Sequence, residues 1–196
     1  MHIKVMSFNL RYDNPGDGLN AWGTRKTRVR AAVRKHDPLL VGTQEGLAGM
    51  LQDLDGLLPG YARVGEGRRG GSEDEHTAIY FKEDELALDD WGQFWLSEEP
   101  AKAGSISWDS NLPRICTWAS FRFANQQNTG MTGQTLRIYN THLDHIGERA
   151  RQEGASLIWQ MILKHASNDS GEQVPVLLTG DFNSYPDSVA IQFFTG

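Results

Sequence analysis

The order of strand-like and helix-like segments is the feature that most constrains how this chain can fold. Helical periodicity appears towards both ends, whereas roughly residues 61–145 contain strand-like segments only. A doubly wound parallel sheet needs a helix between successive strands, so this long strand-only stretch fits it poorly. Two packed sheets with helices on their outer faces fit better.

The individual elements follow from residue type and spacing. Strands are predicted for runs rich in β-branched and aromatic residues, at 3–9, 39–44, 76–81, 114–123, 136–143 and 175–182, with weaker ones at 61–65 and within 86–96. Helices are predicted over 24–36, 47–58 and 148–166, with a further one near Asp187. Thr24 is the predicted N-cap of the first helix. Loops are predicted at 66–75, which we expect to be mobile, and at 125–134.

Composition indicates one domain and gives no sign of a broad nucleic-acid-binding surface. With 196 residues, 39% of them hydrophobic, and no repeat or linker, the chain is expected to form one domain over residues 1–196. The formal net charge of −6 does not indicate nucleic acid as a partner, which leaves open only a local site for it.

Cys116 is the only cysteine, which favours a reducing compartment, and with no visible signal peptide we expect a cytoplasmic protein. We expect no membrane span, because no apolar run is long enough.

Four of the predicted strands end on polar side chains. In each, the alternation of side chains gives one face that begins apolar and becomes polar towards the carboxyl end. In the second strand, for example, Glu45 follows Val41 and Thr43 on one face. The polar residues at the four ends are Asn9, Glu45, His142 with Asp144, and Asp181 with Asn183. One such ending would be an ordinary turn, but four of them indicate a shared polar site at one edge of the sandwich.

Each of these residues also has a plainer explanation. The asparagines could be turn residues, Glu45 a favourable charge at a helix N-terminus, His142 a hydrogen-bonded core histidine, and Asp144 a partner of Arg149 or Arg151. We favour a functional role for Asn9, Glu45, His142, Asp181 and Asn183. The plainer explanation is favoured for Asn14, His2, His36, His76 and His165.

The residue types at the strand ends indicate the chemistry. Carboxylate and amide oxygens, with one imidazole and no cysteine, suit Mg²⁺ or Mn²⁺ better than zinc. A second carboxylate could orient an attacking water, while amide donors and a protonated histidine would stabilise charge on phosphorus. The sequence contains neither a G-x-S-x-G elbow nor a phosphate-binding P-loop, so those two classes of enzyme are not indicated.

At these residues the sequence resembles the endonuclease/exonuclease/phosphatase superfamily of metal-dependent phosphoesterases. The matching blocks are "SFNLR" (7–11), "TQEG" (43–46), "PRICTWASF" (113–121), "YNTHLDH" (139–145) and "TGDFNS" (179–184), in family order. The resemblance implies an α/β fold, a four-layer α/β/β/α sandwich of two packed mixed sheets. It also implies a phosphoesterase that uses Mg²⁺ or Mn²⁺ to help water attack a phosphodiester or phosphomonoester.

The resemblance assigns roles to individual residues. Glu45 would ligate the metal, and Asn9 would help position the metal or the phosphate. Asp181 would orient or activate the water. Contacts to the scissile phosphate would come from His142, Asn183 and Arg114.

One family block is missing from this sequence. The family closes with a Ser-Asp-His block, but only thirteen residues follow Asn183 and none is histidine. We therefore expect a domain incomplete at its C-terminus, lacking the last strands, at best weakly active and prone to self-association. The alternatives are a non-catalytic module that binds a phosphate ligand, an inactive fragment, or a sandwich whose polar strand ends are only turns. The substrate is left open between nucleic acid, phosphosugar and phospholipid, and "GRRGG" (67–71) could serve a small phosphorylated ligand.

Overall fold

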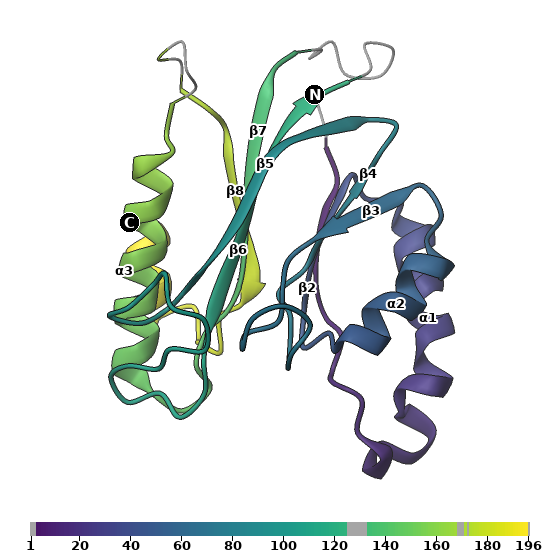
Figure 1. The fold of residues 1–196 in the computed structure, drawn as a ribbon, viewed down its shortest axis with the longest axis horizontal. Helices are drawn as coiled ribbons and strands as arrows, with labels where there is room; N and C mark the ends of the chain where they lie inside the picture. Colours follow the sequence, from purple (N-terminus) through teal and green to yellow (C-terminus); the bar gives the residue numbers. More distant parts are fainter. Residues whose placement is uncertain (1–2, 125–132, 168–170, 172, 196) are drawn as a thin grey trace.

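The computed structural model describes residues 3–124, 133–167, 171 and 173–195, and within them two four-stranded sheets pack face to face (Figure 1). The first sheet has the order β1-β2-β4-β3, formed by β1 (Val5–Asn9), β2 (Leu40–Gln44), β3 (Tyr61–Val64) and β4 (Ile79–Lys82). The second has the order β5-β6-β7-β8, formed by β5 (Leu86–Trp95), β6 (Ile115–Phe123), β7 (Thr135–His142) and β8 (Val176–Asp181). Each sheet combines parallel and antiparallel pairs. The predicted sandwich of two mixed sheets is confirmed.

Helices form the two outer layers (Figure 1). The first sheet is covered by α1 (Trp22–His36) and α2 (Ala48–Leu57), and the second by α3 (Glu148–Lys164) and α4 (Val189–Thr195). A short 3-10 helix, η1 (Pro15–Asn20), precedes α1. The predicted strands and helices are thus found to within a few residues, while most of the predicted loop at 125–134 lies outside the described residues.

Three apolar clusters hold the layers together. The first lies between α1, α2 and the first sheet and includes Val29, Val33, Met50, Leu51 and Leu54. The second lies between the sheets and includes Leu40, Ile79, Phe121 and Ile138. The third joins the second sheet to α3 and α4 and includes Phe94, Tyr139, Ile158 and Ala190. Burial of apolar surface on both faces of both sheets therefore fixes the four layers.

The start of α1 corrects one prediction. The helix begins at Trp22 rather than after Thr24, and its N-cap residue, Ala21, makes no side-chain hydrogen bond. Instead, the carboxylate of Asp13 accepts a hydrogen bond from the backbone N–H of Trp22 at 3.3 Å. Because a side chain nine residues away satisfies this N–H and the Trp22 side chain is buried, the helix starts two residues before the expected cap.

Two parallel strand pairs bring four carboxyl ends to one side of the sandwich. In the first sheet Asn9 is in register with Gln44, and in the second sheet His142 is in register with Asp181. The sheets approach each other at β1 and β8, where the Ser7 hydroxyl donates to the carbonyl of Gly180 and accepts from its N–H, both at 3.2 Å. The ends of these strands are therefore neighbours across the sandwich as well as along each sheet.

A buried polar network joins the sheets below this edge. The Asn140 side chain is fully buried, and its Nδ2 donates to the backbone carbonyls of Thr43 at 2.8 Å and Ala78 at 3.1 Å. Its Oδ1 accepts from Gln44 Nε2 at 2.8 Å and from the Thr179 hydroxyl at 3.0 Å. Both N–H donors and both acceptor positions of this amide are therefore used, which fixes the spacing of the two sheets.

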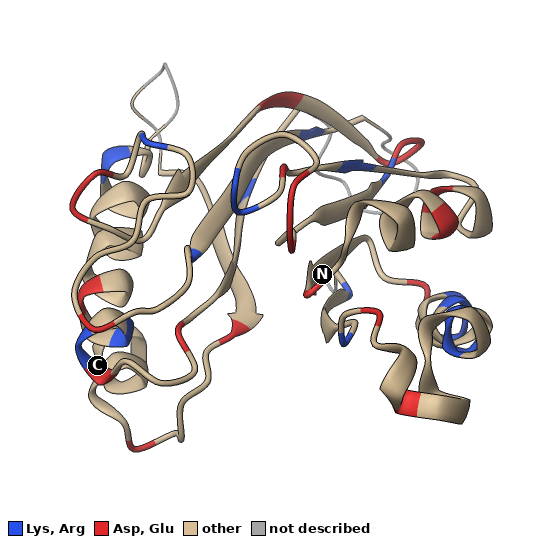
Figure 2. Cartoon of the chain, turned by 60° about the horizontal axis from the view of Figure 1, so that its bottom comes forward, with Lys and Arg blue, Asp and Glu red and all other residues tan. Residues whose placement is uncertain are grey.

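Charges of both signs are interspersed over both halves of the molecule (Figure 2). Within the described residues, no helix is both long enough and apolar enough to cross a membrane.

Candidate active site

The centre of the site is an amide held between two carboxylates. Asn9, at the end of β1, donates through Nδ2 to Glu45 Oε1 at 2.7 Å and to Asp181 Oδ2 at 2.9 Å. Its Oδ1 accepts from the backbone N–H of Arg11 at 2.8 Å. Three of the residues predicted from strand ends are therefore in direct contact, although they are up to 172 positions apart in the chain.

Glu45 reaches the site by a different route from the predicted one. Val41 packs towards the helices, and the face of β2 that looks across the sandwich carries Leu40, Gly42 and Gln44 instead. Glu45 has a φ of 61°, so the chain leaves the strand in a left-handed conformation and the simple alternation no longer applies. Its Oε2 accepts from the backbone N–H of Tyr12 at 3.0 Å. Glu45 lines the cleft with the other predicted residues, but the strand face that it was assigned to was wrong.

Asp181 and Asn183 form a turn directly after β8. Asn183 has a φ of 45°, its N–H donates to Asp181 Oδ1 at 3.1 Å, and its Nδ2 donates to the Leu143 carbonyl at 3.0 Å. Both oxygens of Asp181 are thus held by hydrogen bonds. Burial opposes ionisation of Asp181, but the hydrogen bonds from Asn9 and the Asn183 backbone outweigh it and lower its pKa.

His142 lies at the end of β7 and is 8% exposed. Burial and the nearby guanidinium of Arg114 lower its pKa to about 4, so the imidazole is neutral at pH 7. The expectation of a protonated histidine is therefore wrong for this structure. As a neutral ring, His142 can donate one hydrogen bond. Its Nδ1 lies 4.0 Å from Glu75 Oε2.

Arg114 is 6% exposed, and its guanidinium group is held by neighbouring side chains. Its Nε donates to Asp144 Oδ2 at 3.4 Å, and one terminal nitrogen donates to His145 Nδ1 at 2.8 Å. Asp144 also accepts from the N–H groups of Ile146 and Gly147. The carboxylate of Asp144 thus pairs with Arg114, not with Arg149 or Arg151 as its plainer explanation proposed.

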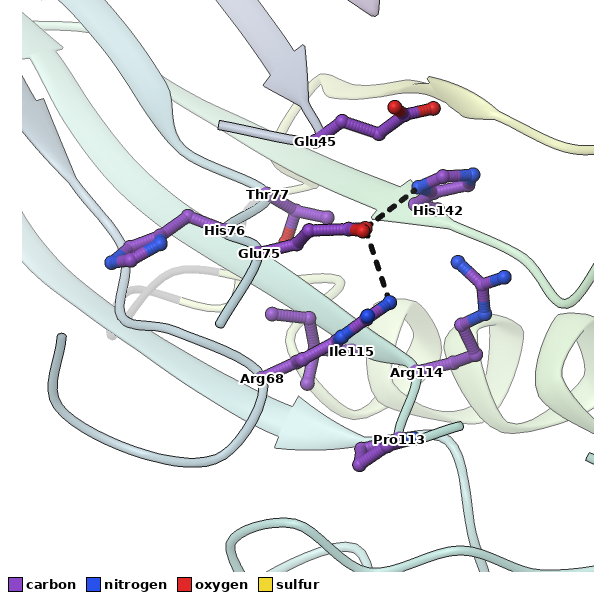
Figure 3. A pocket seen from close by; sticks show the side chains of 9 residues that line it. All are labelled: Glu45, Arg68, Glu75, His76, Thr77, Pro113, Arg114, Ile115 and His142. Carbon is purple, nitrogen blue, oxygen red and sulfur yellow. Dashed lines mark hydrogen bonds and ion pairs between the residues drawn. The ribbon is translucent and has the colours of Figure 1, made fainter. Parts of the chain in front are cut away.

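These residues border one open cleft with a volume of about 320 Å³. It is lined by the predicted site residues Glu45, Arg114, His142, Asp181 and Asn183. It is also lined by Arg68, from the "GRRGG" segment that was considered for a phosphorylated ligand, and by Arg11, Tyr12, Glu75, Leu112 and His145, which were not assigned to the site. Behind it a recess of about 10 Å³, between Glu45, Arg68, Glu75, Arg114 and His142 among others, has room for about one water molecule (Figure 3).

Two charged residues of the cleft, Arg68 and Glu75, come from the loop at 66–75. The structure gives this predicted mobile loop a defined conformation, with backbone hydrogen bonds such as that from the N–H of Arg68 to the carbonyl of Glu75 at 2.9 Å. Burial raises the pKa of Glu75, against the effect of the Arg68 guanidinium. The sequence signal was available: arginine and acidic residues around paired glycines, directly before a predicted strand.

Most residues for which a plainer explanation was favoured have the structural role that this explanation gave them. Asn14 accepts from the N–H of Gly16 at 2.9 Å in a turn. His165 hydrogen-bonds to the Tyr139 hydroxyl at 2.9 Å, and His36 is exposed on α1. His76 is buried, with Nδ1 3.0 Å from the carbonyl oxygen of Gly46, and it is one of the residues that line the recess. His2 lies outside the described residues.

Comparison with known proteins identifies the family. The model of the endonuclease/exonuclease/phosphatase family matches residues 6–196. The chain belongs to this family. A mannosyl-6-phosphatase of Bacteroides thetaiotaomicron VPI-5482 is 36% identical, with a TM-score of 0.90 over 98% of this chain and 70% of that one. A family member from Bacteroides vulgatus is 38% identical, with a TM-score of 0.89 over the same shares. Protein angel of Drosophila melanogaster is 26% identical over 184 residues, and the match spans about half of that protein (48%) and 90% of this chain.

The donor set of this family member can be tested against a divalent cation. Among the described residues, no group of three or more His, Cys, Asp or Glu side chains is placed to hold a metal. Mg²⁺ does not require one, because it commonly takes one or two carboxylates and keeps several waters. Glu45 supplies a hard carboxylate donor in the cleft, and the Asn9 amide that is bound to it also binds the carboxylate of Asp181. The residues therefore fit Mg²⁺ or Mn²⁺.

Proposed function

We propose that this protein is an Mg²⁺- or Mn²⁺-dependent phosphoesterase that cleaves a phosphate ester by attack of water. The observation that carries the proposal is the Glu45–Asn9–Asp181 contact at the mouth of a cleft whose wall holds Arg114 and His142. Acidic oxygen donors on one side and phosphate-binding donors on the other are the combination that phosphoryl transfer to water needs.

The cation would be held by Glu45 with Asn9 beside it. When bound, it supplies positive charge to the phosphate oxygens and to the attacking or leaving oxygen. Asn9 keeps Glu45 and Asp181 apart through its two hydrogen bonds, so the carboxylates do not need a proton between them.

Asp181 would hold the attacking water. Its lowered pKa keeps it ionised at neutral pH, and both oxygens are fixed by the Asn9 amide and the Asn183 N–H. An ionised, immobile carboxylate orients a water by accepting its proton in a hydrogen bond.

The opposite wall would bind the phosphate. Arg114 is held by Asp144 and His145, so its remaining donors are pre-positioned towards the cleft. His142, neutral at pH 7, would donate a hydrogen bond to the phosphate without adding a charge, and the carboxylate of Glu75 lies 4.0 Å from its Nδ1. Asn183 borders the same space.

Metal-dependent hydrolysis of 4-nitrophenyl phosphate and bis(4-nitrophenyl) phosphate tests the proposal. Asp181→Asn should lower kcat by roughly 10²–10⁴-fold and change KM little, because orienting the water matters mainly in the transition state. Asp187→Asn, an exposed change in the same segment, is the matched control.

A near-normal kcat in Asp181→Asn would show that Asp181 is only a turn residue. Binding of Mg²⁺ and phosphate without turnover of either substrate would instead support the alternative, a non-catalytic module that binds a phosphate ligand.

A further inference from the structure

We propose that Arg68 is a second phosphate-binding arginine of this cleft, and that with Arg114 it makes the site selective for phosphomonoesters over phosphodiesters. The inference rests on the proposed phosphoesterase function and names its substrate class. Neither strand periodicity nor the matching sequence blocks included Arg68, which was noted only within "GRRGG" (67–71) as part of a segment that could serve a small phosphorylated ligand.

The hydrogen-bonding state of Arg68 is the first support. Its side chain is 9% exposed, with its terminal nitrogens 3.0 Å from Asp74 Oδ1 and 3.0 Å from Glu75 Oε2. A guanidinium has five N–H donors, so these two contacts leave others free for a ligand. The Nε of Arg68 is buried and has no hydrogen-bond partner among the described residues. A buried donor without an acceptor is costly, so the protein itself does not satisfy this guanidinium completely.

The position of Arg68 is the second support. Arg68 and Arg114 both line the open cleft and the recess behind it, together with Glu45, Glu75 and His142. Figure 3 shows the two guanidinium groups on the side of His142 and Glu75 that lies away from Glu45. Because Glu45 and both arginines line the same open cleft, a phosphate bound in it lies in a space that both guanidinium groups border.

The loop at 66–75 is shaped to hold Arg68 in this place. A Cβ at Gly67 would lie 1.9 Å from the carbonyl oxygen of Glu73, so the loop closes only around a glycine. Gly70 has a φ of 99°, which also favours glycine. Trp95 Nε1 donates to the carbonyl of Arg68 at 2.6 Å and ties the loop to β5. Because the side chain is already ordered, little entropy is lost when it binds a ligand.

The charge of the ligand decides between the two ester classes. A phosphomonoester carries about −1.5 to −2 charge and three acceptor oxygens near pH 7. A phosphodiester carries a single charge and offers two non-bridging oxygens. The extra oxygen and charge of the monoester are what a second guanidinium can bind. The recess behind the arginines has room for about one water, so a second ester group cannot pass that way.

The competing explanation is that Arg68 only holds Glu75 against His142. In that case its loss would disturb His142 and slow both ester classes equally. The ratio of the two activities therefore separates a phosphate-binding role from a structural one.

The test compares Arg68→Gln with Arg69→Gln, which removes the exposed neighbouring arginine that pairs with the same Asp74. We expect Arg68→Gln to lower kcat/KM for 4-nitrophenyl phosphate about 10–100-fold more than for bis(4-nitrophenyl) phosphate, the effect of one charge-assisted hydrogen bond. Arg68→Lys, which keeps the charge but loses the planar fork, should fall between the wild type and Arg68→Gln. Arg69→Gln should leave the ratio unchanged. Equal losses for both substrates in Arg68→Gln and Arg68→Lys would overturn the inference.

Binding without turnover separates this inference from the proposed function. Titration calorimetry with methyl phosphate and dimethyl phosphate, in the presence of Mg²⁺, should show tighter binding of the dianion, and Arg68→Gln and Arg68→Lys should each reduce that preference. This result in a protein that hydrolyses neither ester would support Arg68 while the hydrolase proposal failed. Equal affinity of the wild type for the two ligands would overturn the inference even if hydrolysis were observed.

Discussion

At the scale of single residues, the site depends on backbone conformations that are unusual for residues other than glycine. Glu45 and Asn183 both have positive φ, as does Arg11 near the mouth of the cleft. Such conformations cost energy unless the surroundings compensate, and here the hydrogen bonds of Asn9, Tyr12 and Asp181 do so. Strand ends that turn in this way bring side chains from both sheets to one point.

Removing the charge of Glu45 should weaken metal binding and leave the fold intact. In Glu45→Gln the side-chain oxygen can still accept from the N–H of Tyr12, so the local structure keeps a partner. We expect the affinity for Mg²⁺ to fall by at least about tenfold in titration calorimetry, since a charged ligand is lost. Glu83→Gln, at an exposed turn, is the control. An unchanged Mg²⁺ affinity would contradict the assignment of Glu45 as a metal ligand.

At the scale of secondary-structure elements, the two sheets are held at a fixed spacing by close contact at Gly42 and by the Asn140 network. A Cβ at Gly42 would lie 2.3 Å from the Thr179 hydroxyl and 2.6 Å from Asn140 Oδ1. No side chain fits there without displacing the hydrogen bonds that join β2, β7 and β8. The cleft lies directly above this contact, so its width depends on it.

Gly42→Ala should therefore destabilise the protein. We expect a loss of roughly 1–3 kcal/mol, typical of overpacking in a core, and a melting temperature lower by about 2–4 °C for each kcal/mol. Gly49→Ala in α2 is the matched control, because its Cβ would meet no described atom within 4 Å, and alanine favours the helix. Equal melting temperatures of Gly42→Ala and the wild type, measured by circular dichroism, would show that the sheets can separate at no cost.

At the scale of the whole molecule, folding lowers the pKa of three histidines, of which His76 and His142 are buried and His165 is half-buried. Burial lowers the pKa of His76 and of His165, and burial with Arg114 lowers that of His142. The unfolded chain therefore binds more protons than the folded one below the ordinary histidine pKa of about 6.5. The contribution of these histidines to the free energy of unfolding is complete above pH 6.5 and declines as the pH falls.

The expected tendency of the protein to self-associate stays a prediction, which analytical ultracentrifugation can check.

The melting temperature, measured without divalent cations, should consequently fall between pH 7 and pH 5. This window lies above the titration of the carboxylates whose pKa is lowered, such as Asp144 and Asp181. The raised pKa of Glu75 acts in the opposite direction, but it is one group against three histidines. His165→Gln should make the dependence shallower. A melting temperature that is constant over this range would contradict the lowered pKa values of these histidines.

The sequence by itself determined the layers and half of the site. The strand-only stretch and the apolar periodicities predicted two sheets with outer helices, because periodicity reports directly which face of an element is buried. Alternation along β1, β7 and β8 placed Asn9, His142 and Asp181 correctly, since parallel neighbours end at the same edge. The tertiary structure alone decided the rest. Glu45 reaches the site through a left-handed residue that alternation cannot foresee, and Arg68 and Glu75 reach it because a glycine-rich loop folds back against β5. Such contacts join residues far apart in the chain, and they exist only once the sheets have packed.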